Sequence, residues 1–293
     1  MANGGDTSKI TRDYFDSLLL EMRHIDAVKP TTETVIYGEK FSSPIMTAAL
    51  SHLDKVRPNG TVLMAQGAYA SKSAMWIGMG DEEELEAIIE TGAKTIKIIK
   101  PYADNDVILK KIEHAEKSGA LAVGIDIDHA FGSISEWDYI LGLRMSPKSF
   151  DEIKSFVNAT KLPFIIKGVL SLQDALKCLE AGVNGIVVSH HHGMVDYALP
   201  PLMILPKIAK AVGGKFPIFV DCCFERGLDV FKALALGATA VSVGRALMKP
   251  LKDDGADGVQ KYIEEMKHEL QWAMAVTCSK NPSSIDPTIL WNK

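Results

Sequence analysis

The chain has no excess of positive charge. Its 37 aspartate and glutamate residues outnumber 32 lysine and arginine residues, which gives a formal net charge of −5. A domain that binds nucleic acid ordinarily carries a basic patch or stripe that meets the phosphates. We therefore expect no nucleic-acid partner.

Cysteines and long apolar runs are also scarce. The four cysteines show no CxxC spacing, and a disulfide between the adjacent Cys222 and Cys223 would be strained. This pattern is typical of a reducing compartment. No apolar run approaches the ~20 residues that cross a bilayer, and residues 1–6 lack the basic and apolar regions of a secretory signal. We expect a cytoplasmic protein with no membrane partner.

What the chain does contain, from Pro44 onward, is a regular alternation of apolar runs of strand length with amphipathic stretches of helix length. Strands are predicted at 44–49, 74–79, 95–99, 121–127, 163–168, 185–190, 217–221 and 240–244. Helices are predicted at 60–71, 81–91, 104–118, 149–159, 171–181, 198–212, 226–236 and 256–276. This strict alternation predicts an α/β fold, a closed (β/α)8 barrel of the TIM type.

The barrel is expected to form a single domain, since such barrels routinely accommodate ~250 residues as one unit. We predict a barrel over 41–293 and a short N-terminal helical extension over 1–40. Within the extension, residues 1–8 are interpreted as a loose tail and 14–22 as a short helix.

Polar residues stand at the ends of the later predicted strands. Lys167, the histidines at 190–192, Asp221 and the pair Gly244-Arg245 each follow an apolar run. The C-terminal strand ends of a barrel open onto one face, where active sites lie. We therefore expect these side chains to converge on one pocket. Gly244-Arg245 after the eighth strand also fits the phosphate site that barrels build there.

The run His190-His191-His192 suggests a metal site at first sight. Consecutive residues of an extended strand point to alternate faces, so three in a row cannot all ligate one ion. No acidic partner stands at a ligand-like spacing. We predict no metal, and one catalytic histidine with two neighbours of other use.

The stretch from Lys167 to Leu251 resembles the FMN-dependent α-hydroxy acid oxidases and dehydrogenases. The strongest matching run is Arg226-Gly227-Leu228-Asp229-Val230-Phe231-Lys232-Ala233-Leu234-Ala235-Leu236-Gly237-Ala238, followed by Val243-Gly244-Arg245. Weaker likeness extends the match to roughly 33–290. The resemblance implies an FMN-dependent oxidoreductase, a small-molecule substrate, and a homo-oligomer of four or eight chains.

The resemblance also implies roles for individual residues. His191 would take the proton from the substrate hydroxyl, Asp128 would pair with His191, and Lys167 would stabilise negative charge on the reduced flavin. Contacts to FMN would come from Ala48, Ala49, Lys167, Ser189, Asp221, Cys223, Arg226, Gly244 and Arg245. Arg226 is included because Glu225 occupies the position of a phosphate-binding arginine in the family.

The substrate side departs from the family pattern. Met194 stands where the family has an arginine that binds the substrate carboxylate, and a second such arginine is missing unless Arg144 supplies it. Both are the candidate substrate residues. We therefore expect a hydroxyl-bearing substrate other than a simple 2-hydroxy acid, under a short lid formed by 129–146.

Two further classes of function stay open at this point. A flavin-free isomerase, epimerase or aldolase would bind a sugar phosphate at Gly244-Arg245 and use His191, or Lys167 as a Schiff-base lysine. Alternatively, the barrel would bind a ligand without turnover. The visible absorbance of a flavin separates the first of these from the FMN enzyme.

Overall fold

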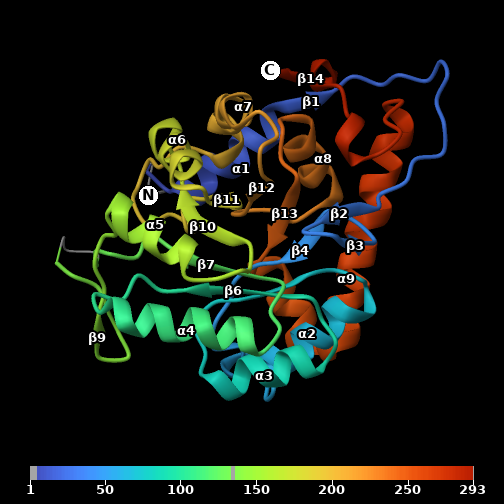
Figure 1. Ribbon diagram of the computed structural model, residues 1–293. Helices are drawn as coiled ribbons and strands as arrows, with labels where there is room; N and C mark the ends of the chain where they lie inside the picture. The colour runs from blue at the N-terminus through green and yellow to red at the C-terminus, as the bar shows by residue number, and fades with distance from the viewer. Residues whose placement is uncertain (1–4, 133–135, 293) are drawn as a thin grey trace.

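Eight parallel strands form the centre of the computed structural model, which describes residues 5–132 and 136–292 (Figure 1). The strands are β4 (Ile45–Thr47), β5 (Met75–Ile77), β6 (Thr95–Ile99), β7 (Ala122–Asp126), β10 (Phe164–Val169), β11 (Gly185–Val188), β12 (Ile218–Val220) and β13 (Ala240–Val243). Neighbours in sequence pair in parallel, and β13 pairs with β4. The Thr47 amide donates to the Ala74 carbonyl, and a bridge joins Leu50 to Ile77, so β4 and β5 close the ring. The predicted barrel is confirmed.

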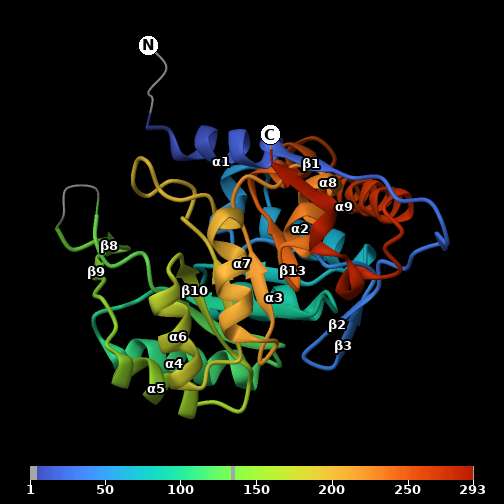
Figure 2. The same ribbon diagram turned by 90° about the horizontal axis from the view of Figure 1, so that it is seen from above.

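One helix follows each strand and lies outside the barrel (Figures 1 and 2). The helices are α2 (Gly60–Ala70), α3 (Glu82–Glu90), α4 (Asn105–Lys117), α5 (Phe150–Asn158), α6 (Leu172–Ala181), α7 (Pro201–Val212), α8 (Gly227–Ala235) and α9 (Met248–Val276). Seven lie close to their predicted bounds. The last was predicted from 256 but begins at Met248, because two helical pieces meet at Gly255, whose φ is 63°.

The N-terminal helix was predicted in the wrong register. The structure has α1 at Thr7–Ser17, not 14–22, and the Asp6 side chain caps it by accepting hydrogen bonds from the Ser8 and Lys9 amides. The leucines expected in the helix form β1 (Leu18–Leu20), which pairs antiparallel with β14 (Leu290–Asn292). Strand partners so distant in sequence leave no local signal. Residues 1–4 of the predicted tail lie outside the described residues.

A hairpin that the sequence analysis missed closes one end of the barrel. It consists of β2 (Thr34–Ile36) and β3 (Glu39–Phe41). The Tyr37 hydroxyl donates to the Asn184 carbonyl at 2.9 Å, just before β11 begins, so the hairpin lies at the N-terminal end of the strands. Ile36 and Phe41 belong to the same buried cluster as the interior side chains Met46, Trp76, Ile98, Ile165, Val187 and Phe219. The interior is thus a packed core, and a pocket forms at the opposite, C-terminal face.

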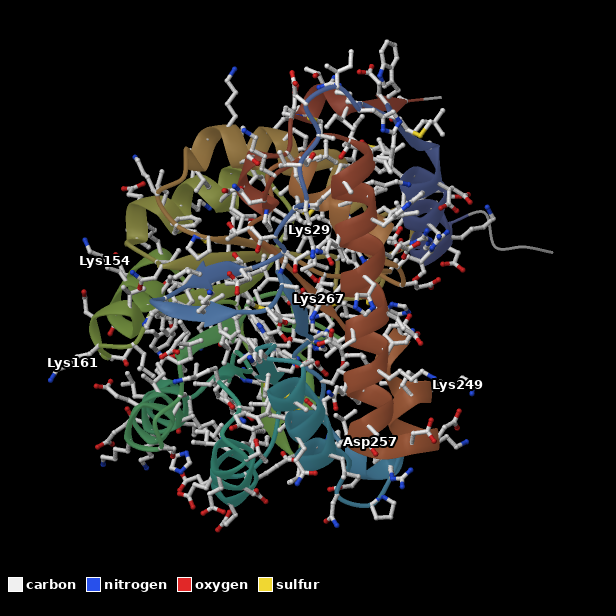
Figure 3. The ribbon with its side chains drawn as sticks, turned by 90° about the vertical axis from the view of Figure 1, so that its right-hand side faces the viewer. Lys29, Lys154, Lys161, Lys249, Asp257 and Lys267 are labelled. Carbon is white, nitrogen blue, oxygen red and sulfur yellow. The ribbon has the colours of Figure 1, made fainter. Side chains whose placement is uncertain are left out.

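The predicted lid contains a short hairpin. Within the lid, β8 (Tyr139–Ile140) and β9 (Leu143–Arg144) form a short hairpin, and 133–135 lie outside the described residues. Figure 3 shows Lys249, Asp257 and Lys267 along α9. Among residues 5–132 and 136–292, no helix combines the length and apolar character that crossing a membrane requires.

A partly buried ion pair fixes α1 to the barrel. The Asp229 carboxylate, near the start of α8, is 2% exposed and accepts from Arg12 Nη1 at 2.8 Å. The same oxygen also accepts from the amides of Glu225 and Arg226 at 3.0 and 3.1 Å. A buried carboxylate with three donors holds both the turn before α8 and the helix that carries Arg12.

We predict that Asp229→Ala lowers the free energy of unfolding by ~2–4 kcal/mol, because three donors lose a buried, charged acceptor. Asp16→Ala is the matched control: Asp16 binds the same Arg12 at 2.8 Å, but its side chain is 67% exposed. Its loss should cost less than ~1 kcal/mol. Urea unfolding of both variants measures the difference. Equal losses would show that Asp229 has no special structural role.

Candidate active site

Charged side chains from four strand ends meet at the C-terminal face of the barrel. Lys167 Nζ, on β10, lies 3.3 Å from Asp126 Oδ1 at the end of β7 and 3.7 Å from Asp221 Oδ2 after β12. It lies 3.1 Å from Nδ1 of His191, which follows β11. The convergence expected from the sequence is therefore present.

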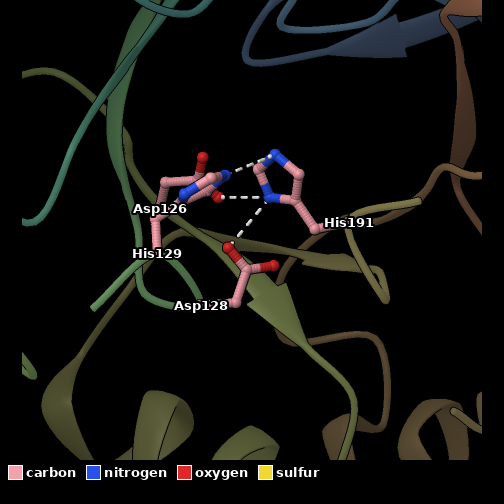
Figure 4. A group of neighbouring side chains, drawn as sticks. All are labelled: Asp126, Asp128, His129 and His191. Atoms are coloured by element: carbon pink, nitrogen blue, oxygen red, sulfur yellow. Dashed lines mark hydrogen bonds and ion pairs between the residues drawn. The ribbon is translucent and has the colours of Figure 1, made fainter. Parts of the chain in front are cut away.

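The His191 ring is held by carboxylates (Figure 4). Its Nδ1 lies 2.9 Å from Asp128 Oδ1 and 3.4 Å from Asp126 Oδ1. The His191 amide donates to Ser189 Oγ at 3.0 Å, and its φ of 47° turns the chain away from strand geometry. An imidazole whose Nδ1 is fixed by a carboxylate presents Nε2 as the nitrogen for proton transfer.

Because of this turn, the side chains of His190, His191 and His192 point in different directions. His190 is buried, and its Nε2 lies 2.9 Å from Thr11 Oγ1 on α1. His192, whose φ is 59°, contacts the Arg245 guanidinium. Of the three, only His191 contacts Asp126 and Asp128. That it is the one catalytic histidine stays a prediction.

Burial and neighbouring charges shift the pKa values of Asp126 and Asp128 in opposite directions. Burial alone would raise the pKa of Asp126, but the Lys167 charge and the His191 hydrogen bond outweigh it and lower that pKa well below its usual value. Burial and the neighbouring Asp126 charge raise the pKa of Asp128. Burial alone would lower the pKa of His191, but its hydrogen bonds to both aspartates raise it. Asp126 therefore remains a permanent anion in the cluster.

Two members of the site were missed by the sequence analysis. Lys100 Nζ lies 2.6 Å from Asp126 Oδ2, and both side chains are buried. His129 Nε2 lies 3.0 Å from His191 Nε2. Lys100 directly follows β6, as the other site residues end or follow their strands, so the same rule would have found it. His129 stands next to Asp128 in the chain but had no such signal.

The side chains of Asp126, Asp128, His129 and His191 place ligand-type atoms within 4.8 Å of one another. The ammonium groups of Lys100 and Lys167 already lie against the Asp126 carboxylate, at 2.6 and 3.3 Å. A metal ion would have to compete with two buried cations for the same oxygens. We therefore assign the positive charge of this cluster to the lysines.

Beside this cluster lies a cavity of about 680 Å³, within the usual range for sites of small molecules and cofactors. Its lining includes predicted residues from five strand ends, namely Ala48, Ala49, Lys167, His191, Asp221, Cys223, Gly244 and Arg245. Ser242 Oγ, also in the lining, is among the few buried polar atoms without a hydrogen-bond partner in the described chain. A cavity whose lining offers Arg245, Lys167 and an unsatisfied hydroxyl suits a polar, anionic cofactor such as FMN.

The N-terminal extension forms part of the same cavity. Asp6, Ser8, Lys9 and Arg12, from α1 and its cap, contribute to the lining. Arg12 Nη1 also donates to the Cys223 carbonyl at 3.0 Å. These residues were not predicted, because nothing in the local sequence shows that α1 packs across the strand ends.

Three of the predicted site residues do not line the cavity with the others. Arg226, proposed to replace a phosphate-binding arginine, pairs with Glu269 of α9 instead, because it starts α8 on its exposed side. The Arg144 guanidinium lies over the Trp137 ring at 5.4 Å on the exposed β8–β9 hairpin. The Met194 side chain is 44% exposed. The remaining predicted residue, Ser189, is buried and holds the His191 backbone.

Comparisons with known proteins agree with this geometry. A family model described as FMN-dependent dehydrogenase matches residues 1–150 and 145–292. Peroxisomal (S)-2-hydroxyacid oxidase GLO3 of Arabidopsis thaliana is 29% identical over 286 residues, which cover 86% of this chain and 79% of that protein. Glycolate oxidase of Spinacia oleracea is 29% identical over 304 residues, covering 91% and 82%.

Solved structures give the same result. Mandelate oxidase with 3,3-difluoro-2-hydroxy-3-phenylpropionic acid has a TM-score of 0.89 and 26% identity, and the match covers 99% of this chain and 91% of that chain. A mandelate oxidase variant with a monooxide FMN adduct has a TM-score of 0.88, also at 26% identity, covering 99% and 92%.

The matches confirm the expected FMN cofactor and decide against the flavin-free and non-catalytic alternatives. The oligomeric state and the cytoplasmic location stay predictions. Since the family model spans nearly the whole sequence, this chain belongs to the FMN-dependent dehydrogenase family and is an FMN-dependent oxidoreductase similar to the α-hydroxy acid oxidases.

Proposed function

We propose that this enzyme oxidises a hydroxyl-bearing small molecule, with His191 as the base that accepts the hydroxyl proton. The observation that carries the proposal is the Asp128–His191 pair, 2.9 Å between Oδ1 and Nδ1, at the edge of the cavity beside Lys167. FMN, when bound, would supply the redox chemistry as the acceptor of a hydride equivalent. Asp128 keeps the His191 ring oriented and stabilises its protonated form.

Lys167 would stabilise negative charge on the cofactor. Burial alone would lower its pKa, but Asp126 and Asp221 raise the pKa above its ordinary value. The ammonium therefore stays charged throughout turnover and cannot act as the neutral amine that a Schiff-base mechanism needs. Its pairing with Asp126 also fixes the direction in which it points.

We propose that Gly244, Arg245 and the Cys223 amide hold the FMN phosphate, while Asp221 binds the ribityl hydroxyls. Ala48, Ala49 and the Ser189 region would form the remaining cofactor wall. The lining of the cavity supports this assignment, since it includes all of these except Ser189. We also propose that residues 1–40 form an extension separate from the barrel over 41–293, with α1 covering the cavity from outside the barrel.

The proposed substrate is not a simple 2-hydroxy acid. Met194 is half-exposed and offers neither charge nor a donor, and the Arg144 guanidinium lies over Trp137. Lys100, which is buried beside the same cluster, is bound to Asp126 at 2.6 Å. A small carboxylate would lose its hydration without gaining an arginine pair. An alcohol, a hydroxy-ketone or a larger, less anionic molecule fits this site better.

We predict that Arg245→Ala weakens FMN binding by ~1.5–3 kcal/mol, because a charge-assisted contact to phosphate is lost. Riboflavin, which lacks the phosphate, should bind nearly as before. Quenching of flavin fluorescence measures both affinities. Arg226→Ala is the control, since that side chain is 60% exposed and pairs with Glu269. An equal loss of affinity for both flavins would show that Arg245 is structural.

We expect L-lactate and glycolate to be turned over at least ~100-fold more slowly than the true substrate. This ratio corresponds to ~2.7 kcal/mol of transition-state binding that an arginine would otherwise supply. Anaerobic bleaching of the bound flavin gives the measurement. Rapid bleaching by either acid would contradict the proposed substrate class without affecting the cofactor assignment.

His191→Ala should reduce turnover by ~10²–10⁴-fold, the usual contribution of a positioned base. Asp128→Asn should move the acidic limb of the pH–rate profile to lower pH. The reason is that the carboxylate raises the pKa of His191, and the base works only in its neutral form. An unchanged acidic limb would exclude Asp128 as the partner that tunes the base.

A further inference from the structure

Four polar side chains form a continuous hydrogen-bonded chain from Asp128, just after β7, to the lid. Asp128 Oδ1 lies 2.9 Å from His191 Nδ1, and His191 Nε2 lies 3.0 Å from His129 Nε2. His129 Nδ1 then lies 3.1 Å from Asp138 Oδ2. Figure 4 shows the two imidazoles meeting through their Nε2 atoms. Both nitrogens of each ring are therefore used.

The far end of the chain reaches water. The Asp138 side chain is 27% exposed and stands between the exposed residues Trp137 and Tyr139. Its other oxygen, Oδ1, accepts from the Tyr139 amide at 2.9 Å, which holds the carboxylate in place. Asp138 therefore connects a partly buried imidazole pair to the lid.

The charges around the pair decide which of the two rings holds the shared proton. The groups that face the two rings are Asp126 and Asp128 from β7 and the residues after it, Lys100 after β6, Lys167 on β10, and Asp138 in the lid. Burial, Lys100 and His191 lower the pKa of His129, whereas hydrogen bonds to the aspartates raise the pKa of His191 against the effect of burial. These directions favour His191 over His129 as the ring that holds the proton, so transfer to His129 is uphill and is completed by release through Asp138 to water.

We propose that His129 and Asp138 form the route by which the proton taken up by His191 leaves the site. The proposal rests on the proposed function, in which His191 is the base. The N–H bond at His191 Nε2 breaks and one forms at His129 Nε2. The N–H bond at His129 Nδ1 breaks and its proton passes to Asp138 Oδ2, then to water. No electrons move, and His129 ends in its other neutral tautomer.

The same geometry sets the order of events. His191 Nε2 cannot face a substrate hydroxyl and His129 at once, because one lone pair makes one contact. His129 must turn aside when substrate binds and return when product has left. The relay is thus the step that restores the neutral base between turnovers, and His129 acts as a positioning and proton-transfer residue through His191.

Titration of the imidazoles by NMR, in protein with labelled histidine, tests the relay without requiring turnover. If the rings share a proton, each should titrate in two steps, since strongly interacting groups have joint pKa values. His129→Gln should leave a single step for His191. Asp138→Asn should lower the pKa of His129 by about half a unit, the effect expected of a half-exposed ion pair. Glu136→Gln, which removes an exposed carboxylate of the same loop, should change neither ring.

Kinetics provides the second test. Asp138→Asn and His129→Gln should slow proton release, followed with an indicator dye, more than flavin reduction in the first turnover. Added imidazole should restore the steady-state rate of His129→Gln, an effect that a purely structural histidine would not show. Wild-type protein and Glu136→Gln should not respond.

Two outcomes would overturn the relay. Independent single-step titration of each ring, unaffected by Asp138→Asn, would show that no proton is shared. Faster turnover in His129→Gln, without imidazole dependence, would show that His129 only obstructs the base. If no hydroxyl compound reduces the flavin but the coupled titration is present, the proposed function fails and the coupled imidazole pair remains.

Discussion

The site depends on one buried anion, the Asp126 carboxylate. It lies 2.6 Å from Lys100 Nζ, 3.3 Å from Lys167 Nζ and 3.4 Å from His191 Nδ1. Burying an ammonium group is costly unless a charge and hydrogen bonds compensate it. One carboxylate thus permits two lysines and an imidazolium to share a buried space. These partners come from three other strand ends, so the electrostatics also fixes how those ends are placed.

The rest of the fold leaves a cavity beside this cluster. The β2–β3 hairpin and the packed interior close the opposite end of the barrel, while α1 covers part of the open face. The wall at Cys222 and Cys223 is strained, with φ values of 74° and 62°. Such backbone costs of order 1–3 kcal/mol per residue and persists where surrounding contacts determine it. Here Cys222 Sγ donates to Asp221 and accepts from the His192 amide, which connects the ends of the adjacent strands β11 and β12.

Local patterns account for what could be predicted. Apolar runs of strand length and helical periodicity predicted all eight barrel strands and the helices between them. Lys167, His191 and Asp221 were found because strand ends of a barrel meet on one face. The β1–β14 pair was missed, since partners at the two ends of the chain have no short-range signature.

The sequence by itself determined the barrel, its family and the residues that end each strand, because these follow from periodicity and from runs of neighbouring residues. Only the tertiary structure decided which charges compensate one another. Arg226 pairs with Glu269 because of where α8 begins, and Lys100 points inward and pairs with Asp126. His129 contacts His191 from a separate loop. These choices depend on distances of a few ångströms between segments far apart in the chain. Buried electrostatics changes steeply over such distances, and sequence spacing does not encode them.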